Sequence, residues 1–178
     1  MTIVDMKTLT DVQRTQAAQM LTDELPQGWA TLADALQELK ELREKDLDAT
    51  LMAAVMDEVV IGWCGIMPQY NGHVYELHPL VVRHDWQRKG VGTKLMHEAM
   101  GIARDKGALT MWLGADDEDG ETSLANVDLY DDLPRHIREF DPGTHQSAFY
   151  MKLGFKVVGV VPDANGIGKP DIYMAKRL

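Results

Sequence analysis

The chain has 178 residues, of which 45% are hydrophobic and 26% are charged, a composition typical of one globular domain with its own core. No stretch approaches the roughly 20 apolar residues of a membrane-spanning helix, so we expect no membrane partner. The formal net charge is −10. Because phosphate binding needs clustered Lys and Arg, this charge argues against a nucleic-acid partner and favours a cationic one.

The N-terminus and the cysteine content narrow the class of protein further. Residues 1–9 contain neither a basic nor an apolar signal-peptide region, so we expect a cytoplasmic location. Cys64 is the single cysteine, which excludes an internal disulfide and a thiolate metal cluster, and we predict no metal cofactor. Since Cys64 lies in the apolar run Val59–Met67, it is interpreted as a small buried hydrophobe rather than a nucleophile.

The first half of the chain predicts two helices followed by a β-hairpin. Thr10–Glu24 carries apolar residues near one face, and Leu32–Leu42 repeats Leu and Ala at helical spacing. Ala49–Met56 and Val59–Met67 are rich in β-forming residues and flank Asp57-Glu58, which predicts a hairpin turn.

The second half alternates strands and helices. The expected elements are a strand at Val74–Val82, a helix at Gly90–Lys106 stopped by Gly107, a strand at Leu109–Leu113, helices at Thr122–Leu129 and His145–Leu153, and strands at Phe155–Val161 and Ile172–Ala175. This order predicts an α/β fold, one domain over residues 1–178, with a twisted mixed sheet of about six to seven strands flanked by helices.

The segment Gln87–Thr93, with the sequence Q-R-K-G-V-G-T, lies between a predicted strand and a predicted helix. Its glycines permit close backbone approach, and N–H groups at the helix start can converge on phosphate oxygens. Arg88 and Lys89 add positive charge. The segment matches neither a Walker A loop nor the three-glycine dinucleotide fingerprint. An ordinary turn into a helix is the alternative interpretation, but the basic pair and the strand-turn-helix context favour phosphate binding.

The string Q-R-K-G-V-G after V-V-R-H-D-W resembles the Q/R-x-x-G-x-G/A motif of the GNAT superfamily of N-acetyltransferases. The resemblance implies that acetyl-CoA is the co-substrate and that backbone groups of Leu80, Val81 and Val82 hold its pantetheine arm and thioester. It also implies that the pyrophosphate is held by Gln87, Arg88, Lys89, Gly90, Val91, Gly92 and Thr93.

N-acetyl transfer needs a base for the amine, a polarised thioester carbonyl and a proton for the leaving thiolate. Glu76 is a carboxylate in an otherwise apolar strand upstream of the loop, so we predict it as the base, acting through a water. A structural salt-bridge or hydrogen-bond partner is its alternative role. His78 is the rival base, and a structural histidine is its alternative. Glu76, His78 and Leu80 share a face of a regular strand, although Pro79 implies a bulge or a break in pairing. The Leu80 N–H is expected to point at the thioester oxygen.

Tyr150 is the candidate acid. An unperturbed phenol has a pKa of about 10, suited to protonating a thiolate. The string A-F-Y-M-K-L-G-F resembles the C-terminal helix and strand of GNAT proteins, whose first tyrosine faces the coenzyme sulfur. Without the resemblance, a core tyrosine is the alternative interpretation.

Longer strings resemble one branch of the aminoglycoside 6'-N-acetyltransferases, namely E-L-H-P-L-V-V, L-G-A-D-D-E-D-G-E-T-S-L, D-L-Y and F-Y-M-K-L-G-F-K-V-V-G-V-V-P-D-A-N-G-x-G-K-P-D-I-Y-M-A-K. The match covers most of Ile61–Lys176, whereas the N-terminal helices match only in kind. The resemblance implies direct acetyl transfer to the 6'-amino group of these antibiotics, antibiotic resistance and a homodimer.

Acidic residues crowd the segment Gly114–Gly143, which follows the strand expected at Leu109–Leu113: Asp116, Asp117, Glu118, Asp119, Glu121, Asp128, Asp131, Asp132, Glu139 and Asp141. A carboxylate-lined cleft would attract and orient an aminoglycoside, which carries several ammonium groups. We predict that Asp116 and Asp117, which follow a strand, bind substrate together with Glu76. A solvated acidic loop is the alternative.

Two other functions fit the same residues. An acidic cleft also suits a GNAT enzyme acting on a polyamine, a protein lysine or a protein N-terminus. A non-catalytic acyl-CoA-binding domain would keep the fold, but it would not need both Glu76 and Tyr150. A purely structural interaction protein is disfavoured by the phosphate loop.

Overall fold

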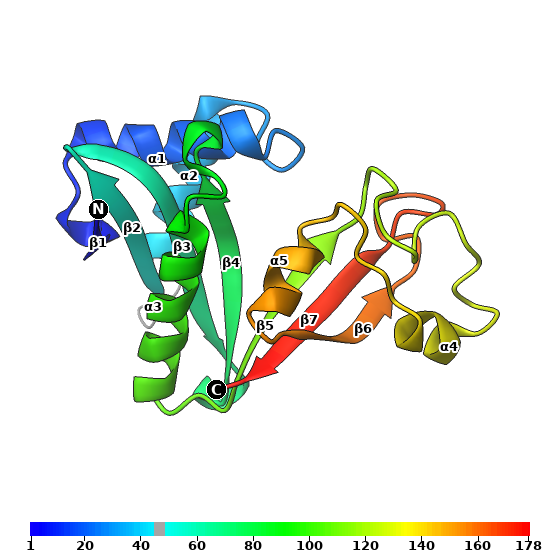
Figure 1. Cartoon of the computed structure of the whole chain (residues 1–178). Helices are drawn as coiled ribbons and strands as arrows, with labels where there is room; N and C mark the ends of the chain where they lie inside the picture. The colour runs from blue at the N-terminus through cyan, green and yellow to red at the C-terminus, as the bar shows by residue number, and fades with distance from the viewer. Residues whose placement is uncertain (45–48) are drawn as a thin grey trace. The chain divides into compact units, whose positions relative to one another are not determined.

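The computed structural model describes residues 1–44 and 49–178. Two compact units are present, one formed by Met1–Leu109 with Leu178 and the other by Thr110–Arg177 (Figure 1). Within the described residues, no helix is both long enough and apolar enough to cross a membrane.

The first unit is an antiparallel sheet with helices on both faces. Its strands pair in the order β1 (Thr2–Asp5), β2 (Thr50–Met56), β3 (Val59–Gln69) and β4 (Val74–Val82). Its helices are α1 (Asp11–Glu24), α2 (Leu32–Glu44) and α3 (Val91–Asp105), with short 3-10 turns η1 (Met6–Thr8), η2 (Tyr70–Gly72) and η3 (His84–Trp86).

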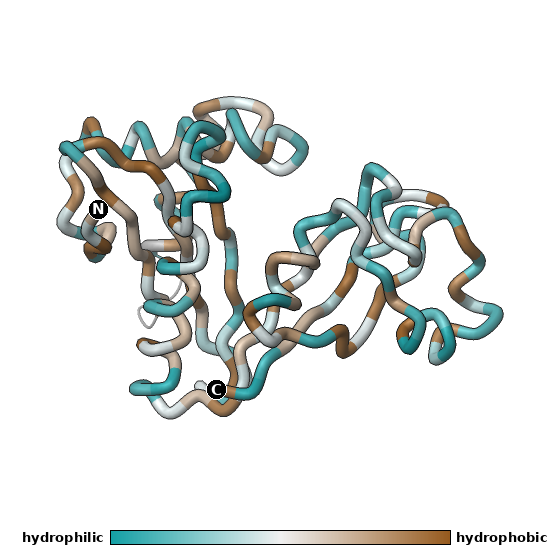
Figure 2. The backbone as a smooth tube through the Cα atoms, in the orientation of Figure 1, coloured by the Kyte–Doolittle hydropathy of each residue, from teal (hydrophilic) through white to brown (hydrophobic). Residues whose placement is uncertain are grey.

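The two faces of this sheet are covered by different helices. Trp63 of β3 is fully buried, and its Nε1 donates to the Ala17 carbonyl of α1 at 2.9 Å. On the opposite face, a Cβ added to Gly62 would lie 2.9 Å from a Val91 methyl group and 3.2 Å from a Leu95 methyl group, so α3 packs there. Hydrophobic and hydrophilic colours alternate around α3 (Figure 2), as expected of a helix with one buried face.

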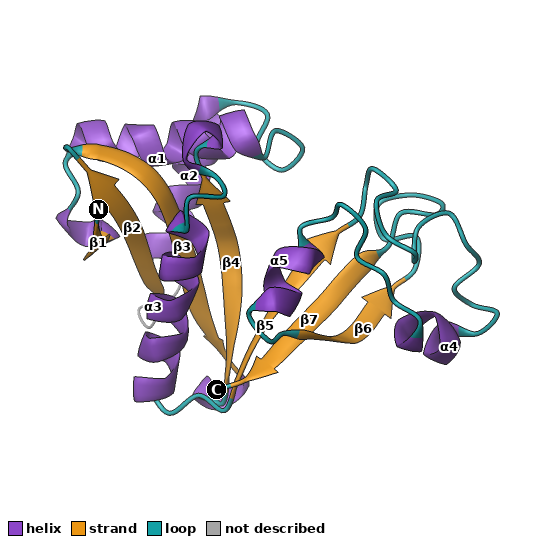
Figure 3. Ribbon diagram, viewed as in Figure 1, coloured by secondary structure: helices purple, strands orange, loops and turns teal. Residues whose placement is uncertain are grey.

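The second unit is built on three antiparallel strands in the order β5 (Thr110–Asp116), β7 (Asp171–Arg177) and β6 (Lys156–Val161). Two short helices, α4 (Leu133–Arg138) and α5 (Ser147–Lys152), belong to it. Most of the chain between β5 and α5 is loop and turn (Figure 3).

The predicted α/β fold is confirmed, and the seven strands agree with the about six to seven predicted. The helix predicted at Thr122–Leu129 is wrong. Asn126 has a positive φ of 57° and donates its N–H to the Gly168 carbonyl at 2.9 Å, so the chain turns there. The helix begins later, at Leu133, after Asp132 accepts a hydrogen bond from the Arg135 N–H at 3.2 Å. Strand β1 was not predicted.

Candidate active site

Strand β4 carries Glu76, His78 and Leu80 and contains the bulge that Pro79 implied. In its register with β3, Leu80 pairs with Cys64 and Leu77 pairs with Ile66, so β4 has one extra residue at this point. The extra residue lies opposite Gly65. A Cβ on Gly65 would lie 2.5 Å from the His78 carbonyl oxygen, so a side chain there would collide with the bulge.

The bulge changes which side chains share a face. Partners across an antiparallel pair point to the same side, and here Glu76 pairs with Met67 while Leu80 pairs with Cys64. Met67 and Cys64 are an odd number of positions apart in β3, so they point to opposite faces. The prediction that Glu76 and Leu80 share a face is therefore wrong. Glu76 lies on the face covered by α1 and α2, because Met67 packs against their core cluster.

Polar and aromatic groups surround Glu76 and His78 on that face. The Gln69 side-chain amide donates to Glu76 Oε2 at 3.1 Å. The His78 Nε2 lies 3.5 Å from Oε1 of Glu38 in α2, and the His78 ring centroid lies 6.0 Å from that of Trp29. Both His78 and Glu38 keep part of their side chains exposed, at 42% and 25%. The α1–α2 segment thus places a carboxylate and an indole beside His78.

The Gln87–Thr93 segment has the backbone geometry of an anion-binding turn. Arg88 and Gly90 have positive φ values of 56° and 84°, and Gly90 is the N-cap residue of α3. No side chain caps the first N–H groups of α3, a statement that holds for the described part of the chain, and a Cβ at Gly90 would meet nothing within 4 Å. These N–H groups and the positive end of the helix dipole suit a phosphate. The Lys89 ammonium lies 5.2 Å from the Trp86 ring centroid.

The coenzyme backbone contacts predicted for Leu80, Val81 and Val82 stay predictions, and the surroundings of these residues differ. The Val81 side chain is buried in the core cluster with α1 and α2. The Val82 carbonyl already accepts a hydrogen bond from the Gln87 side chain at 3.0 Å. Cys64 is completely buried, and burial raises the pKa of its thiol, which agrees with the predicted inert hydrophobe.

Asp116 and Asp117 belong to the second unit and have different roles. Asp117 is fully buried, and its two oxygens accept the N–H groups of Glu121 and Thr122, each at 2.8 Å. Burial raises the pKa of Asp117, but these hydrogen bonds, one from the Thr122 side chain and the electrostatic effect of His145 together lower it by more, so the pKa lies below its usual value. Its carboxylate organises the loop after β5, a role that corrects the prediction of substrate binding. Asp116 is exposed, and its Oδ1 accepts from the Asn165 side-chain amide at 2.5 Å.

Asp171 is a residue that the sequence did not single out. It pairs with Asp116 across β5 and β7, so two carboxylates lie on neighbouring strands at one end of the second unit. Partial burial and the negative charge of Asp116 raise the pKa of Asp171. Two carboxylates held side by side attract a cation. In the sequence, the alternation of polar and apolar residues in the string K-P-D-I-Y, at the start of β7, is the signal that could have identified Asp171.

Tyr150 lies in α5 and is 6% exposed, with ring centroids 5.1 Å from Phe149 and 5.9 Å from Phe155. The start of α5 is tied to the end of β5 by His145. The His145 Nε2 donates to the Asp116 carbonyl at 2.9 Å, and its Nδ1 lies 3.1 Å from the Ser147 hydroxyl. His145 therefore has a structural role in the second unit.

A sequence profile of the Acetyltransferase (GNAT) family matches residues 14–133, which include β4, the Gln87–Thr93 segment and α3. The chain belongs to the GNAT family of acetyltransferases. The phosphate-loop motif and the bulged β4 strand are thus parts of a GNAT domain, and the resemblance in its motifs is confirmed.

Solved structures extend this family assignment over the whole chain. An aminoglycoside 6'-N-acetyltransferase complexed with coenzyme A is 33% identical to this GNAT protein, with a TM-score of 0.92 over 99% of this chain and 97% of that chain. The aminoglycoside 6'-N-acetyltransferase from Enterococcus faecium is also 33% identical, with a TM-score of 0.90 and coverage of 99% and 97%. The ribosomal-protein-alanine N-acetyltransferase from Brucella melitensis is 16% identical, with a TM-score of 0.69 and coverage of 100% of both chains, and shows the fold alone. No curated protein sequence matches the chain.

Proposed function

We propose that this GNAT acetyltransferase transfers the acetyl group of acetyl-CoA to the 6'-amino group of aminoglycoside antibiotics. The observation that carries the proposal is the set of groups around Glu76 and His78, in which Glu38 and Trp29 come from the α1–α2 segment. Carboxylates attract ammonium groups, and an indole face packs against the apolar side of a sugar ring. The similarity to two aminoglycoside 6'-N-acetyltransferases at 33% identity supports the same substrate class.

The coenzyme is held by the turn before α3. The N–H groups at the start of α3 and the positive charges of Arg88 and Lys89 fit the pyrophosphate, and the open space at Gly90 lets the phosphate oxygens approach the backbone. The coenzyme supplies the acetyl group as a thioester when bound. Direct attack by an amine requires neither a metal nor a protein nucleophile.

The proposed chemistry moves one acetyl group and two protons. Glu76 takes a proton from the substrate ammonium through a water, so that the amine nitrogen can form a bond to the acetyl carbon. The Leu80 N–H stabilises the negative oxygen that develops on the thioester carbonyl. When the C–S bond breaks, Tyr150 donates its proton to the leaving sulfur. The nitrogen, which becomes an amide, passes its second proton to the Tyr150 oxygen, so two protons leave the nitrogen in all and the phenol is restored. The contact of His78 with Glu38 suits a residue that orients the acceptor, so His78 is proposed as a substrate-binding residue.

The second unit has carboxylates of its own that suit a polycationic substrate. Asp116 is exposed and Asp171 lies across from it, so this pair is proposed to bind an ammonium group of the drug. We further propose one acetyltransferase domain over residues 1–178 and a cytoplasmic location, as the sequence analysis predicts. A homodimer and a role in antibiotic resistance are proposed because the family resemblance implies them.

A free-thiol release assay with acetyl-CoA tests the proposal. The acceptors are kanamycin, tobramycin, a 6'-hydroxyl aminoglycoside, spermidine and a lysine-rich peptide. Turnover of the 6'-amino drugs with none on the 6'-hydroxyl compound supports the function. Turnover of spermidine or peptide alone would show that the acceptor is another cationic amine rather than an aminoglycoside. Binding of coenzyme A without any turnover would indicate a non-catalytic domain.

A further inference from the structure

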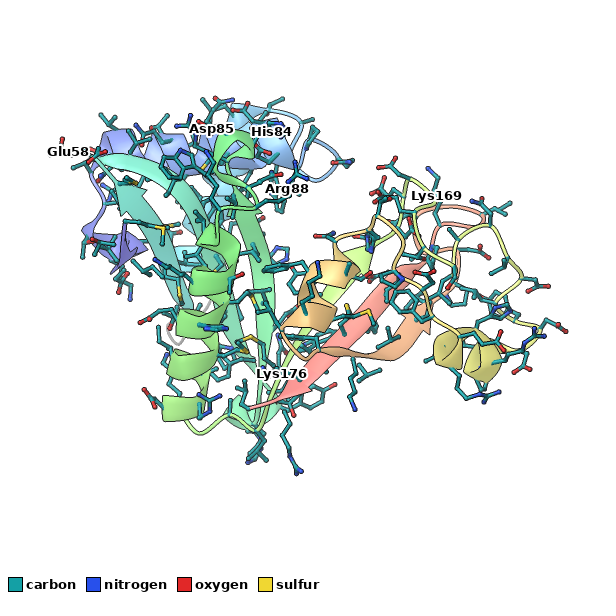
Figure 4. All side chains as sticks on the ribbon, in the orientation of Figure 1. Glu58, His84, Asp85, Arg88, Lys169 and Lys176 are labelled. Carbon is teal, nitrogen blue, oxygen red and sulfur yellow. The ribbon has the colours of Figure 1, made fainter. Side chains whose placement is uncertain are left out.

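Glu24, the last residue of α1, contacts η3 and Gln87, at the start of the Gln87–Thr93 segment (the coenzyme loop). The chemistry proposed above does not use this contact. The Glu24 Oε1 accepts the His84 N–H at 2.7 Å, and its Oε2 accepts a hydrogen bond from the Gln87 side-chain amide at 2.9 Å. The two donors lie at the two ends of the turn η3, which leads into the Gln87–Thr93 segment. One carboxylate therefore fixes both ends of this turn to α1. His84 and Asp85 of η3 and Arg88 of the loop lie near the end of α1 in Figure 4.

The same contact determines what the Gln87 side chain can do. The Gln87 Nε2 donates to Glu24 at 2.9 Å and also to the Val82 carbonyl at 3.0 Å. A primary amide has two N–H hydrogens, so both are used within the protein. The Gln87 side chain is thus occupied within the protein. The phosphate is therefore left to be bound by backbone N–H groups, Arg88 and Lys89.

The loop needs such support because its backbone is unusual. Arg88 has a φ of 56°, in the left-handed region that side-chain-bearing residues rarely adopt. Such a conformation persists where surrounding contacts hold it. Among the described residues, no side-chain hydrogen bond holds Arg88 or Lys89, and Lys89 only lies over the Trp86 ring of η3. The hydrogen bonds of Glu24 to His84 and Gln87 therefore provide the nearest fixed point along the chain.

We propose that Glu24 is a positioning residue for the coenzyme: its carboxylate holds Gln87 and η3 so that the α3 N–H groups are preorganised for the pyrophosphate. This inference rests on the proposed function, because it assumes that the loop binds coenzyme A. Hydrogen bonds to a charged acceptor are stronger than neutral ones, so a neutral amide at position 24 cannot replace the clamp fully.

The test measures coenzyme A binding directly, by isothermal titration calorimetry without any acceptor. The variants are E24Q, E24A and Q87A, and the matched control is D23N, which removes a neighbouring exposed charge of α1 whose partner is Gln19 of the same helix. We expect E24Q and E24A to raise the Kd about tenfold or more, and D23N to leave it within about twofold. In steady-state kinetics the KM for acetyl-CoA should rise, while kcat at saturating acetyl-CoA and the acceptor KM stay close to the wild-type values.

A double variant tests whether Glu24 and Gln87 act together to position the loop or whether Gln87 binds the phosphate independently. If Glu24 and Gln87 act as one unit, E24A/Q87A should bind coenzyme A no more weakly than the weaker of the two single variants. Fully additive losses, or a wild-type Kd for E24Q and E24A, would overturn the inference. Failure of the wild type to bind coenzyme A would overturn the proposed function as well. If coenzyme binding depends on Glu24 but no aminoglycoside is turned over, the proposed acceptor is refuted and the inference about Glu24 is retained.

Discussion

Replacement of Asp117 by Ala should destabilise the protein strongly without touching the chemistry. The Asp117 carboxylate is fully buried and accepts the N–H groups of Glu121 and Thr122 at 2.8 Å each. Each hydrogen bond to a charged group contributes about 1.5–3 kcal/mol, and removal of the carboxylate leaves both N–H groups without their acceptor. Because neighbouring losses are not additive, we expect the free energy of unfolding to fall by about 3–4 kcal/mol.

Urea unfolding of the wild type, D117A and D117N measures this effect. D117N keeps one carbonyl acceptor but turns an NH2 group toward the other N–H. The unfolding free energy that D117N loses should therefore be at least about half of the loss in D117A. A loss below about 1 kcal/mol in D117A would refute the assignment of Asp117 to the loop architecture and would reopen its role in substrate binding.

The pH dependence gives a second readout with a definite sign. The pKa of Asp117 is lower in the folded protein than in the unfolded chain, so its contribution to stability is complete above the unfolded value of about 3.9. The contribution is lost as the pH falls through the folded pKa. The difference in unfolding free energy between the wild type and D117A should therefore shrink below about pH 4. A difference that grows on acidification would contradict this reasoning.

Three further variants test other parts of the structure. G65A should lose about 1–3 kcal/mol in urea unfolding, because its new methyl group would lie 2.5 Å from the His78 carbonyl oxygen; an unchanged stability would refute the bulge geometry. E76Q should lower kcat roughly 10²–10⁴-fold while calorimetry finds the coenzyme A affinity within about twofold, and an equal loss of both would reject Glu76 as the base. H145A should lower the thermal midpoint, because it removes the bond to the Asp116 carbonyl at 2.9 Å, and an unchanged midpoint would deny His145 its structural role.

Local signals in the sequence located the elements of the coenzyme loop well. Strand β4 has the predicted bounds Val74–Val82, and α3 begins after Gly90, because apolar alternation and a glycine turn are encoded within a few residues. The bulge at Pro79 was also foreseen, but its consequence was not. One extra residue in the pairing moves Leu80 to the other face from Glu76, and that depends on the register with β3.

The groups that complete the site come from distant parts of the chain. Glu24 contacts His84 from 60 positions away, and Glu38 and Trp29 contact His78 across the sheet face. No spacing rule links such residues, because tertiary packing alone brings them together. Asp117 was misassigned for a related reason: two adjacent carboxylates look equivalent in sequence, although successive residues point in different directions and only Asp116 stays exposed.

The measurement that tests the proposed activity most directly is the position of the acetyl group on the product. Wild-type enzyme is incubated with acetyl-CoA and kanamycin, and NMR spectroscopy of the purified product identifies the acetylated nitrogen, with a 6'-hydroxyl aminoglycoside as the matched control. We predict acetylation at the 6'-amino group and no product from the control. Acetylation at another amine, or equal turnover of the control, would contradict the proposed 6'-N-acetyltransferase activity.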